Sequence, residues 1–81
     1  MTLKAYRTHF YKELEALYPQ EEYETFFKFL VQEYLKLAAY EIPLNFQLKL
    51  DEAQRNLFDK ALSRLQQNEP LQYIVASTEF Y

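Results

Sequence analysis

The fold of this chain is decided by the stretch YETFFKFLVQEY, residues Tyr23–Tyr34, in which apolar side chains recur at steps of three and four residues. This spacing places them on one side of an α-helix, which we expect over residues 20–37. The apolar side is wide, and a helix with a wide apolar side usually contacts more than one neighbouring helix. Its members are Tyr23, Phe26, Phe27, Leu30, Val31, Tyr34 and, at its end, Ala38.

Two further long helices flank the central one in the sequence. The first covers residues 2–18 with Thr2 as its N-cap, and Pro19 separates it from the central helix. The last covers residues 52–67 and begins with a capping-box pair, Asp51 and Gln54. The apolar faces comprise Leu3, Tyr6, Phe10, Leu14 and Leu17 in the first helix, and Leu57, Phe58, Ala61, Leu62 and Leu65 in the last. We therefore predict an all-α fold, a small bundle of three long helices plus short ones. Its aromatic core is Tyr6, Phe10, Phe26, Phe27 and Phe58.

The segment 38–50 interrupts the helical pattern. Apolar residues alternate with others from Ile42 to Leu50, which is the period of a strand. However, Pro43 lies inside this run, and the first 70 residues offer no partner strand. We expect a short helical turn near residues 38–43, followed by an extended segment that its leucines anchor to the core.

The composition excludes several classes of function. The 81 residues make one small domain, and the net charge of −3 argues against a nucleic-acid binder. The absence of glycine excludes a phosphate-cradling loop, and the absence of cysteine excludes disulfides and thiolate metal sites. No apolar run is long enough for a signal peptide or a membrane span. We expect a soluble, cytoplasmic protein with no direct nucleic-acid or membrane partner.

Catalytic chemistry has few candidate residues here. His9 is the only histidine, and its place beside the apolar face of the first helix indicates a surface position. Glu13, one turn later, would give a metal site only two ligands. Ser63, Ser77 and Thr78 have no histidine nearby in the sequence, and a catalytic triad would need the only histidine. We therefore expect no catalytic, cofactor-binding or metal-binding residue within this chain.

Three aromatic residues lie off the predicted apolar faces. Phe29 lies about 120° from the centre of the central helix's apolar side, and Tyr11 and Tyr40 also look less buried. Exposed aromatic side chains often mark a protein interface. Phe29, Tyr11 and Tyr40 are therefore candidate partner-binding residues; for Phe29 the alternative is packing beneath the segment 38–50.

The last stretch of the chain, NEPLQYIVASTEFY, begins as a helix ending and finishes as a strand. Asn68 suits the left-handed position after a helix, and Pro70 opens a short helix through about Val75. The residues from Ser77 onward look extended, and the chain stops at an apolar Phe-Tyr pair without a polar tail. This ending looks cut rather than finished, and we expect a helical domain at 1–68 and the start of a linker strand at 69–81.

This ending resembles the linker signature of the HemK/PrmC family. The resemblance lies in Glu69-Pro70-Leu71-Gln72-Tyr73-Ile74 followed by Glu79-Phe80-Tyr81. In that family, a small helical domain precedes the signature, and a β-hairpin then leads into a catalytic domain. Asn68 and Ala76 stand where the family usually has glycine; alanine at a left-handed position would cost on the order of 1 kcal/mol.

The resemblance implies a function that the residues alone do not. Members of the family are methyltransferases that use S-adenosylmethionine (SAM) to modify the glutamine of the GGQ motif in class-1 peptide release factors. The resemblance implies that this chain is the release-factor-recognising domain. Its implied partners are the release factor and the chain's own catalytic domain. The SAM site and the catalytic residues are implied to lie beyond Tyr81. Residues implied to make linker and interdomain contacts are Glu69, Pro70, Leu71, Gln72, Tyr73, Phe80 and Tyr81, with Phe80 and Tyr81 in the hairpin. The alternative is a free-standing helical interaction module without an enzyme.

Overall fold

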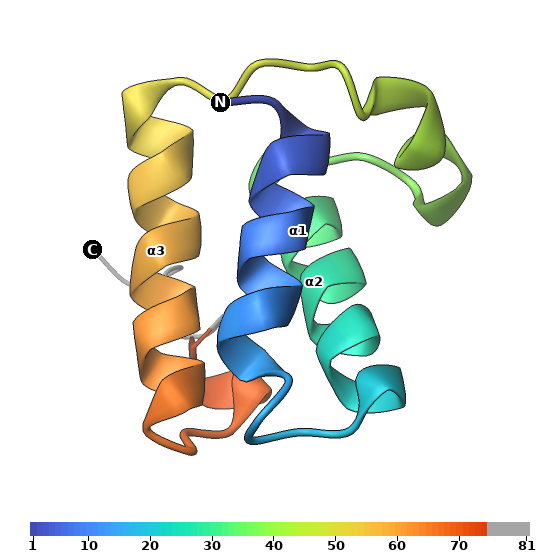
Figure 1. Ribbon diagram of the computed structural model, residues 1–81. Helices are drawn as coiled ribbons and strands as arrows, with labels where there is room; N and C mark the ends of the chain where they lie inside the picture. The colour runs from blue at the N-terminus through green and yellow to red at the C-terminus, as the bar shows by residue number, and fades with distance from the viewer. Residues whose placement is uncertain (75–81) are drawn as a thin grey trace.

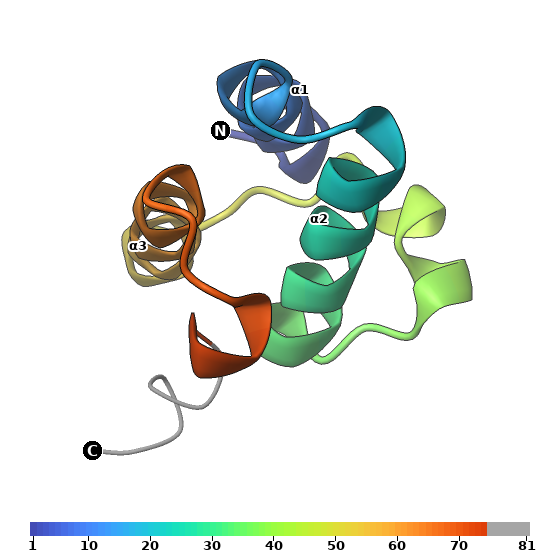
Figure 2. The same cartoon turned by 90° about the horizontal axis from the view of Figure 1, so that it is seen from below.

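Three α-helices form the body of the computed structural model, which describes residues 1–74. They pack against one another pairwise (Figure 1), and the view from below shows α1, α2 and α3 at the corners of a triangle (Figure 2). Two short 3₁₀ turns connect the second helix to the third. In chain order the elements are α1 (Leu3–Leu14), α2 (Gln20–Leu35), η1 (Ala39–Glu41), η2 (Pro43–Asn45) and α3 (Glu52–Gln66). The prediction of an all-α bundle with three long helices is confirmed.

The core is built around the ring of Phe58 on α3, which is fully buried. Its centroid lies 5.4 Å from that of Tyr6 on α1, and 6.1 Å and 5.2 Å from those of Phe27 and Tyr34 on α2. Aromatic rings at these separations attract one another beyond the gain from burial. Phe10 is buried too, so four of the five predicted core aromatics are confirmed; Phe26 is only half-buried.

The predicted helix starts are confirmed by hydrogen bonds. The backbone N–H of Ala5 donates to Thr2 Oγ1 at 3.1 Å, which satisfies a donor that the first turn of α1 leaves free. Asp51 and Gln54 form the reciprocal pair: Gln54 N–H donates to Asp51 Oδ1 at 2.7 Å, and Asp51 N–H donates to Gln54 Oε1 at 3.0 Å.

The predicted end of the first helix is wrong by four residues. The helix stops at Leu14, whose carbonyl accepts the N–H groups of both Leu17 and Tyr18 at 2.9 Å. The chain turns there, before Pro19 can end the helix. Leu17 therefore leaves the apolar face and is 49% exposed, so its assignment to the core is wrong.

The segment 38–50 follows the prediction only in its first part. The expected helical turn is present as η1, and η2 extends it, with Pro43 at its first position, where proline lacks no needed donor. The prediction that leucines anchor the segment to the core is wrong for Leu44 and Leu48, whose exposed fractions are 79% and 39%. Leu50 alone among the segment's leucines is buried.

Backbone hydrogen bonds to the start of the chain hold this segment instead. Leu3 N–H donates to Leu48 O at 2.8 Å, Lys4 N–H donates to Phe46 O at 3.0 Å, and Leu50 N–H donates to Met1 O at 2.9 Å. The first N–H groups of a helix have no acceptor within the helix. Here the carbonyl groups of Phe46 and Leu48 accept hydrogen bonds from two of these N–H groups. The extended stretch does have a partner within the first 70 residues, contrary to the prediction.

The end of α2 carries backbone strain. The predicted helix to residue 37 is two residues too long, because Lys36 adopts a left-handed conformation with φ 59° and ψ 35°. Side chains with a Cβ atom are disfavoured there, and glycine is the usual residue at this position. The chain contains no glycine, and a lysine occupies this left-handed position.

We therefore expect Lys36→Gly to stabilise the fold by about 0.5–1 kcal/mol, because glycine relieves the left-handed strain. The matched control is Lys60→Gly, in the interior of α3, which should destabilise by about 1 kcal/mol. Urea denaturation of both variants measures the difference. A loss of stability in Lys36→Gly would contradict the left-handed assignment.

Candidate functional site

The predicted linker begins at a well-defined turn that closes α3. Asn68 has φ 64°, so the predicted left-handed conformation is confirmed. Its N–H donates to Leu65 O at 3.0 Å, and the N–H of Glu69 donates to Arg64 O at 3.1 Å. These two bonds are those of the Schellman motif, which satisfies the last carbonyls of a helix.

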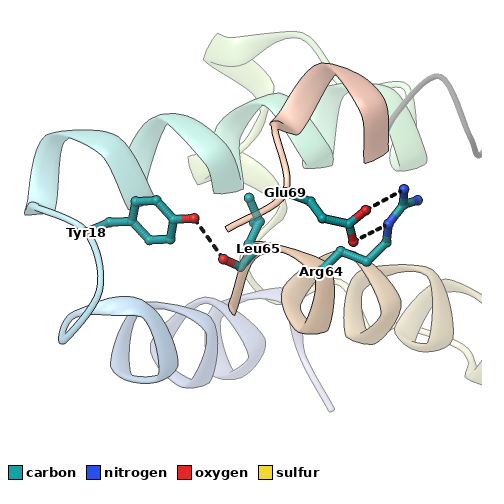
Figure 3. A network of polar contacts seen from close by, with 4 residues as sticks. All are labelled: Tyr18, Arg64, Leu65 and Glu69. Carbon is teal, nitrogen blue, oxygen red and sulfur yellow. Dashed lines mark hydrogen bonds and ion pairs between the residues drawn. The ribbon is translucent and has the colours of Figure 1, made fainter. Parts of the chain in front are cut away.

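A two-pronged ion pair reinforces this turn. Arg64 Nε donates to Glu69 Oε2 at 2.9 Å, and Nη2 donates to Oε1 at 3.1 Å (Figure 3). This arrangement fixes the orientation of both side chains, since the guanidinium and the carboxylate are planar and matched. The hydrogen bonds from Arg64 lower the pKa of the Glu69 carboxyl, so it stays charged at neutral pH. The same two residues are thus joined through their backbones and their side chains.

Tyr18 connects the turn to the loop between α1 and α2. Its hydroxyl donates to Leu65 O at 2.7 Å (Figure 3). The same hydroxyl lies 3.4 Å from Asn68 Oδ1. Its ring meets that of Phe26 edge-on, with centroids 5.0 Å apart. Burial, and then the charge of Glu22, raise the pKa of Tyr18, so the hydroxyl keeps the proton that it donates. The loop therefore holds the end of α3 in place.

After the turn, the chain continues against the bundle. Pro70 opens a helical turn over residues 71–74, in which the N–H groups of Tyr73 and Ile74 donate to Pro70 O at 3.1 Å and 3.3 Å. This confirms the predicted short helix as far as residue 74. Ile74 is only 1% exposed, and Leu71 packs against the core.

The structure divides the predicted linker residues into two groups. Glu69 and Leu71 are partly buried and contact the bundle, whereas Pro70, Gln72 and Tyr73 are exposed. Phe80 and Tyr81 lie outside the described residues, as does Ala76. The domain boundary at residue 68 and the interdomain role of these residues stay predictions.

Three residues of this site were missed from the sequence. Arg64 could have been found, because it precedes Glu69 by five residues across a turn that Asn68 already indicated. Ile74, four residues after Pro70, fits the inner side of the predicted short helix. Tyr18 offered no signal, because its acceptor is a backbone carbonyl 47 residues away.

The three candidate partner-binding aromatics are not gathered in one place. Phe29 on α2 is 41% exposed and Tyr40 in η1 is 77% exposed, so neither belongs to the core. Tyr11 on α1 is half-buried, with its ring centroid 4.9 Å from that of Tyr23. Tyr11 lines a pocket of about 350 Å³ between α1, α2 and the segment 39–46, which neither Phe29 nor Tyr40 lines. Their role in binding a partner stays a prediction.

Other chemistry has little support in the described part of the chain. His9 is exposed, as predicted, and its ring meets that of Tyr6 edge-on. Residues 1–74 contain no group of three or more histidine or carboxylate side chains arranged to hold a metal ion. None of the helices in this part has both the length and the apolar character needed to cross a bilayer.

Comparison with known proteins gives one family. The family model described as the PrmC N-terminal domain matches residues 5–75. A curated relative, the release factor glutamine methyltransferase of Flavobacterium psychrophilum, is 32% identical over 81 residues. The match covers the whole of this chain but only 28% of that protein. No solved structure matches the chain.

The ion pair at the end of α3 should make stability depend on pH. The pKa of Glu69 is lower in the folded chain than in the unfolded one, so its contribution is present at neutral pH and is lost as the pH falls through that lowered pKa. We expect Glu69→Gln to lower the melting temperature at pH 7 by roughly 1–4 °C, since an ion pair that solvent still reaches contributes little.

Thermal melts between pH 2 and pH 7 measure this effect, and the two proteins should converge at the acid end. Glu13→Gln is the control, because Glu13 is exposed on α1 and should leave the melting temperature unchanged. A difference between Glu69→Gln and the parent that stays constant down to pH 2 would argue against an ion pair.

Proposed function

Because this chain belongs to the PrmC N-terminal domain family, we propose that it is the release-factor-recognising domain of a SAM-dependent protein-(glutamine-N5) methyltransferase. The whole enzyme would methylate the side-chain amide nitrogen of the GGQ glutamine in class-1 peptide release factors, during translation termination in the cytoplasm. The observation that carries this proposal is the family match over residues 5–75, which includes the bundle and the first part of the linker signature.

We expect SAM to bind outside this chain. A loop that cradles SAM needs glycines for close backbone approach, and the chain has none. The cofactor, which supplies the methyl group, would bind in the catalytic domain that follows. In this division of labour, the helical bundle contributes contacts to the protein substrate, and the catalytic domain contributes the chemistry.

The bundle would act by positioning. A second contact surface reduces the cost of orienting a large substrate, so the glutamine loop spends more time near the methyl donor. Such positioning requires that the two domains keep a defined relation. The turn at Asn68, the Arg64–Glu69 ion pair and the buried Ile74 hold the start of the linker on the bundle. The exposed residues Pro70, Gln72 and Tyr73 would then be available for contacts with the catalytic domain.

Removal of residues 1–68 from the complete enzyme tests this function. We expect kcat/KM for an intact release factor to fall by roughly 10- to 1,000-fold, because the positioning contacts are lost. A short peptide that carries the GGQ motif is the control substrate, since it cannot reach the bundle, and its kcat/KM should change less than about 3-fold.

Two outcomes would reject the proposal. If the truncated enzyme methylates the intact factor as well as the complete one, the bundle does not recognise the substrate. If the gene has a stop codon after Tyr81, so that no catalytic domain is encoded, the chain is a free-standing interaction module.

A further inference from the structure

The pocket between α1, α2 and the 3₁₀ turns has polar groups that the linker does not use. Its volume is about 350 Å³. The 3₁₀ turns and the residues just after them line the pocket with apolar side chains. The helices α1 and α2 contribute its charged side chains. The residues that matter for its chemistry are Arg7, Tyr11, Glu24, Lys28, Pro43 and Phe46.

Arg7 lines this pocket and contacts two of its aromatic rings. Its guanidinium carbon lies 4.9 Å from the ring centroid of Phe46 and 5.4 Å from that of Tyr11. Two rings at these distances hold a planar cation through cation–π attraction, and the Tyr11 hydroxyl also interacts with the guanidinium through a side-chain hydrogen bond. Nε of Arg7 is buried and has no hydrogen-bond partner, which is costly unless a ligand or a rearrangement supplies an acceptor.

The pocket is locally positive in an acidic chain. Arg7 and Lys28 form no ion pair within residues 1–74, and Glu24, one helical turn before Lys28, is the single acidic residue of the lining. Glu24 accepts a hydrogen bond from Gln20 Nε2 at 2.9 Å. The lining thus carries a net charge of one positive unit, whereas the whole chain carries −3. An acidic group is the ligand that complements this site.

The surroundings indicate that the ligand is part of a protein. Ala39 and Pro43 line the pocket, and their neighbours Tyr40 and Leu44 are 77% and 79% exposed. Two large apolar side chains this exposed gain most when another macromolecule covers them. A small free anion would leave both in water, and the net negative charge of the chain opposes a nucleic acid.

We propose that this pocket binds an acidic side chain on the surface of the release factor, with Arg7 as its main donor. The inference rests on the proposed function, because it names the contact by which the bundle would hold that substrate. A carboxylate can accept two hydrogen bonds from the edge of the guanidinium, which the rings of Tyr11 and Phe46 hold in place. Burial raises the pKa of Tyr11, so its hydroxyl remains protonated near the same ligand. Tyr40 and Leu44 would contact the partner around the pocket.

Calorimetric titration of the 81-residue chain with a class-1 release factor tests the pocket. We expect Arg7→Gln to raise Kd by about 10-fold or more, and Lys28→Gln by about 3-fold, because each removes a positive charge. Glu24→Gln should lower Kd by about 2-fold, since it removes the opposing charge. The control is Lys60→Gln, exposed on α3 and absent from the lining, which should leave Kd unchanged. The effect of Arg7→Gln should shrink at high salt.

The outcomes separate this inference from the function on which it rests. If the parent chain binds the factor and neither Arg7→Gln nor Lys28→Gln differs from Lys60→Gln, the pocket is not the contact, although the recognition function stands. If the parent chain does not bind at low salt, both proposals fail. Should Arg7→Gln melt below the assay temperature, the two exposed positions decide: opposite shifts in Kd for Lys28→Gln and Glu24→Gln support the pocket, and equal or absent shifts overturn it.

Discussion

The ring of Phe58 is where the three helices meet, and the positions of the other parts follow from that contact. It lies against Tyr6 of α1 and against Phe27 and Tyr34 of α2, so neither helix can shift along α3 without losing an aromatic contact. Interiors pack at nearly the density of crystals, and one large ring therefore fixes the register of its neighbours. This register also determines where the end of α3 lies, at which the linker begins. It determines the position of the pocket between α1, α2 and the 3₁₀ turns as well.

The helices were readable from the sequence because their signals are local. Periodic apolar residues and capping pairs act within a few positions, and both predicted caps and the left-handed Asn68 are present. Leu17 was misassigned because periodicity cannot reveal that α1 stops at Leu14. The contact between residues 1–4 and residues 46–50 is backbone hydrogen bonding, to which side-chain pattern contributes nothing. The candidate pocket was missed, apart from Tyr11, because Arg7 and Phe46 come together only through that long-range contact.

Two surfaces of the bundle would have separate tasks in the proposed enzyme. In both views α2 lies between the turn after α3 and the turns η1 and η2 (Figures 1 and 2). A protein bound at the 3₁₀ turns and a domain that continues from the linker would therefore occupy different sides of the molecule. With this arrangement, the bundle would act as a spacer between a docked substrate and the catalytic centre, and its own rigidity would set the distance between them.

The left-handed residues Lys36 and Asn68 also bear on the unfolded chain. A glycine at either place would suit the folded backbone, but it would widen the range of conformations that the unfolded chain can visit. A chain without any glycine gives up less backbone entropy when it folds, over all 81 positions. Such a saving matters most for a domain this small, whose core buries a limited share of its surface. The absence of glycine therefore has two opposite effects on stability. It leaves local strain at two helix ends, and it lowers the conformational entropy of the unfolded chain, which makes unfolding less favourable.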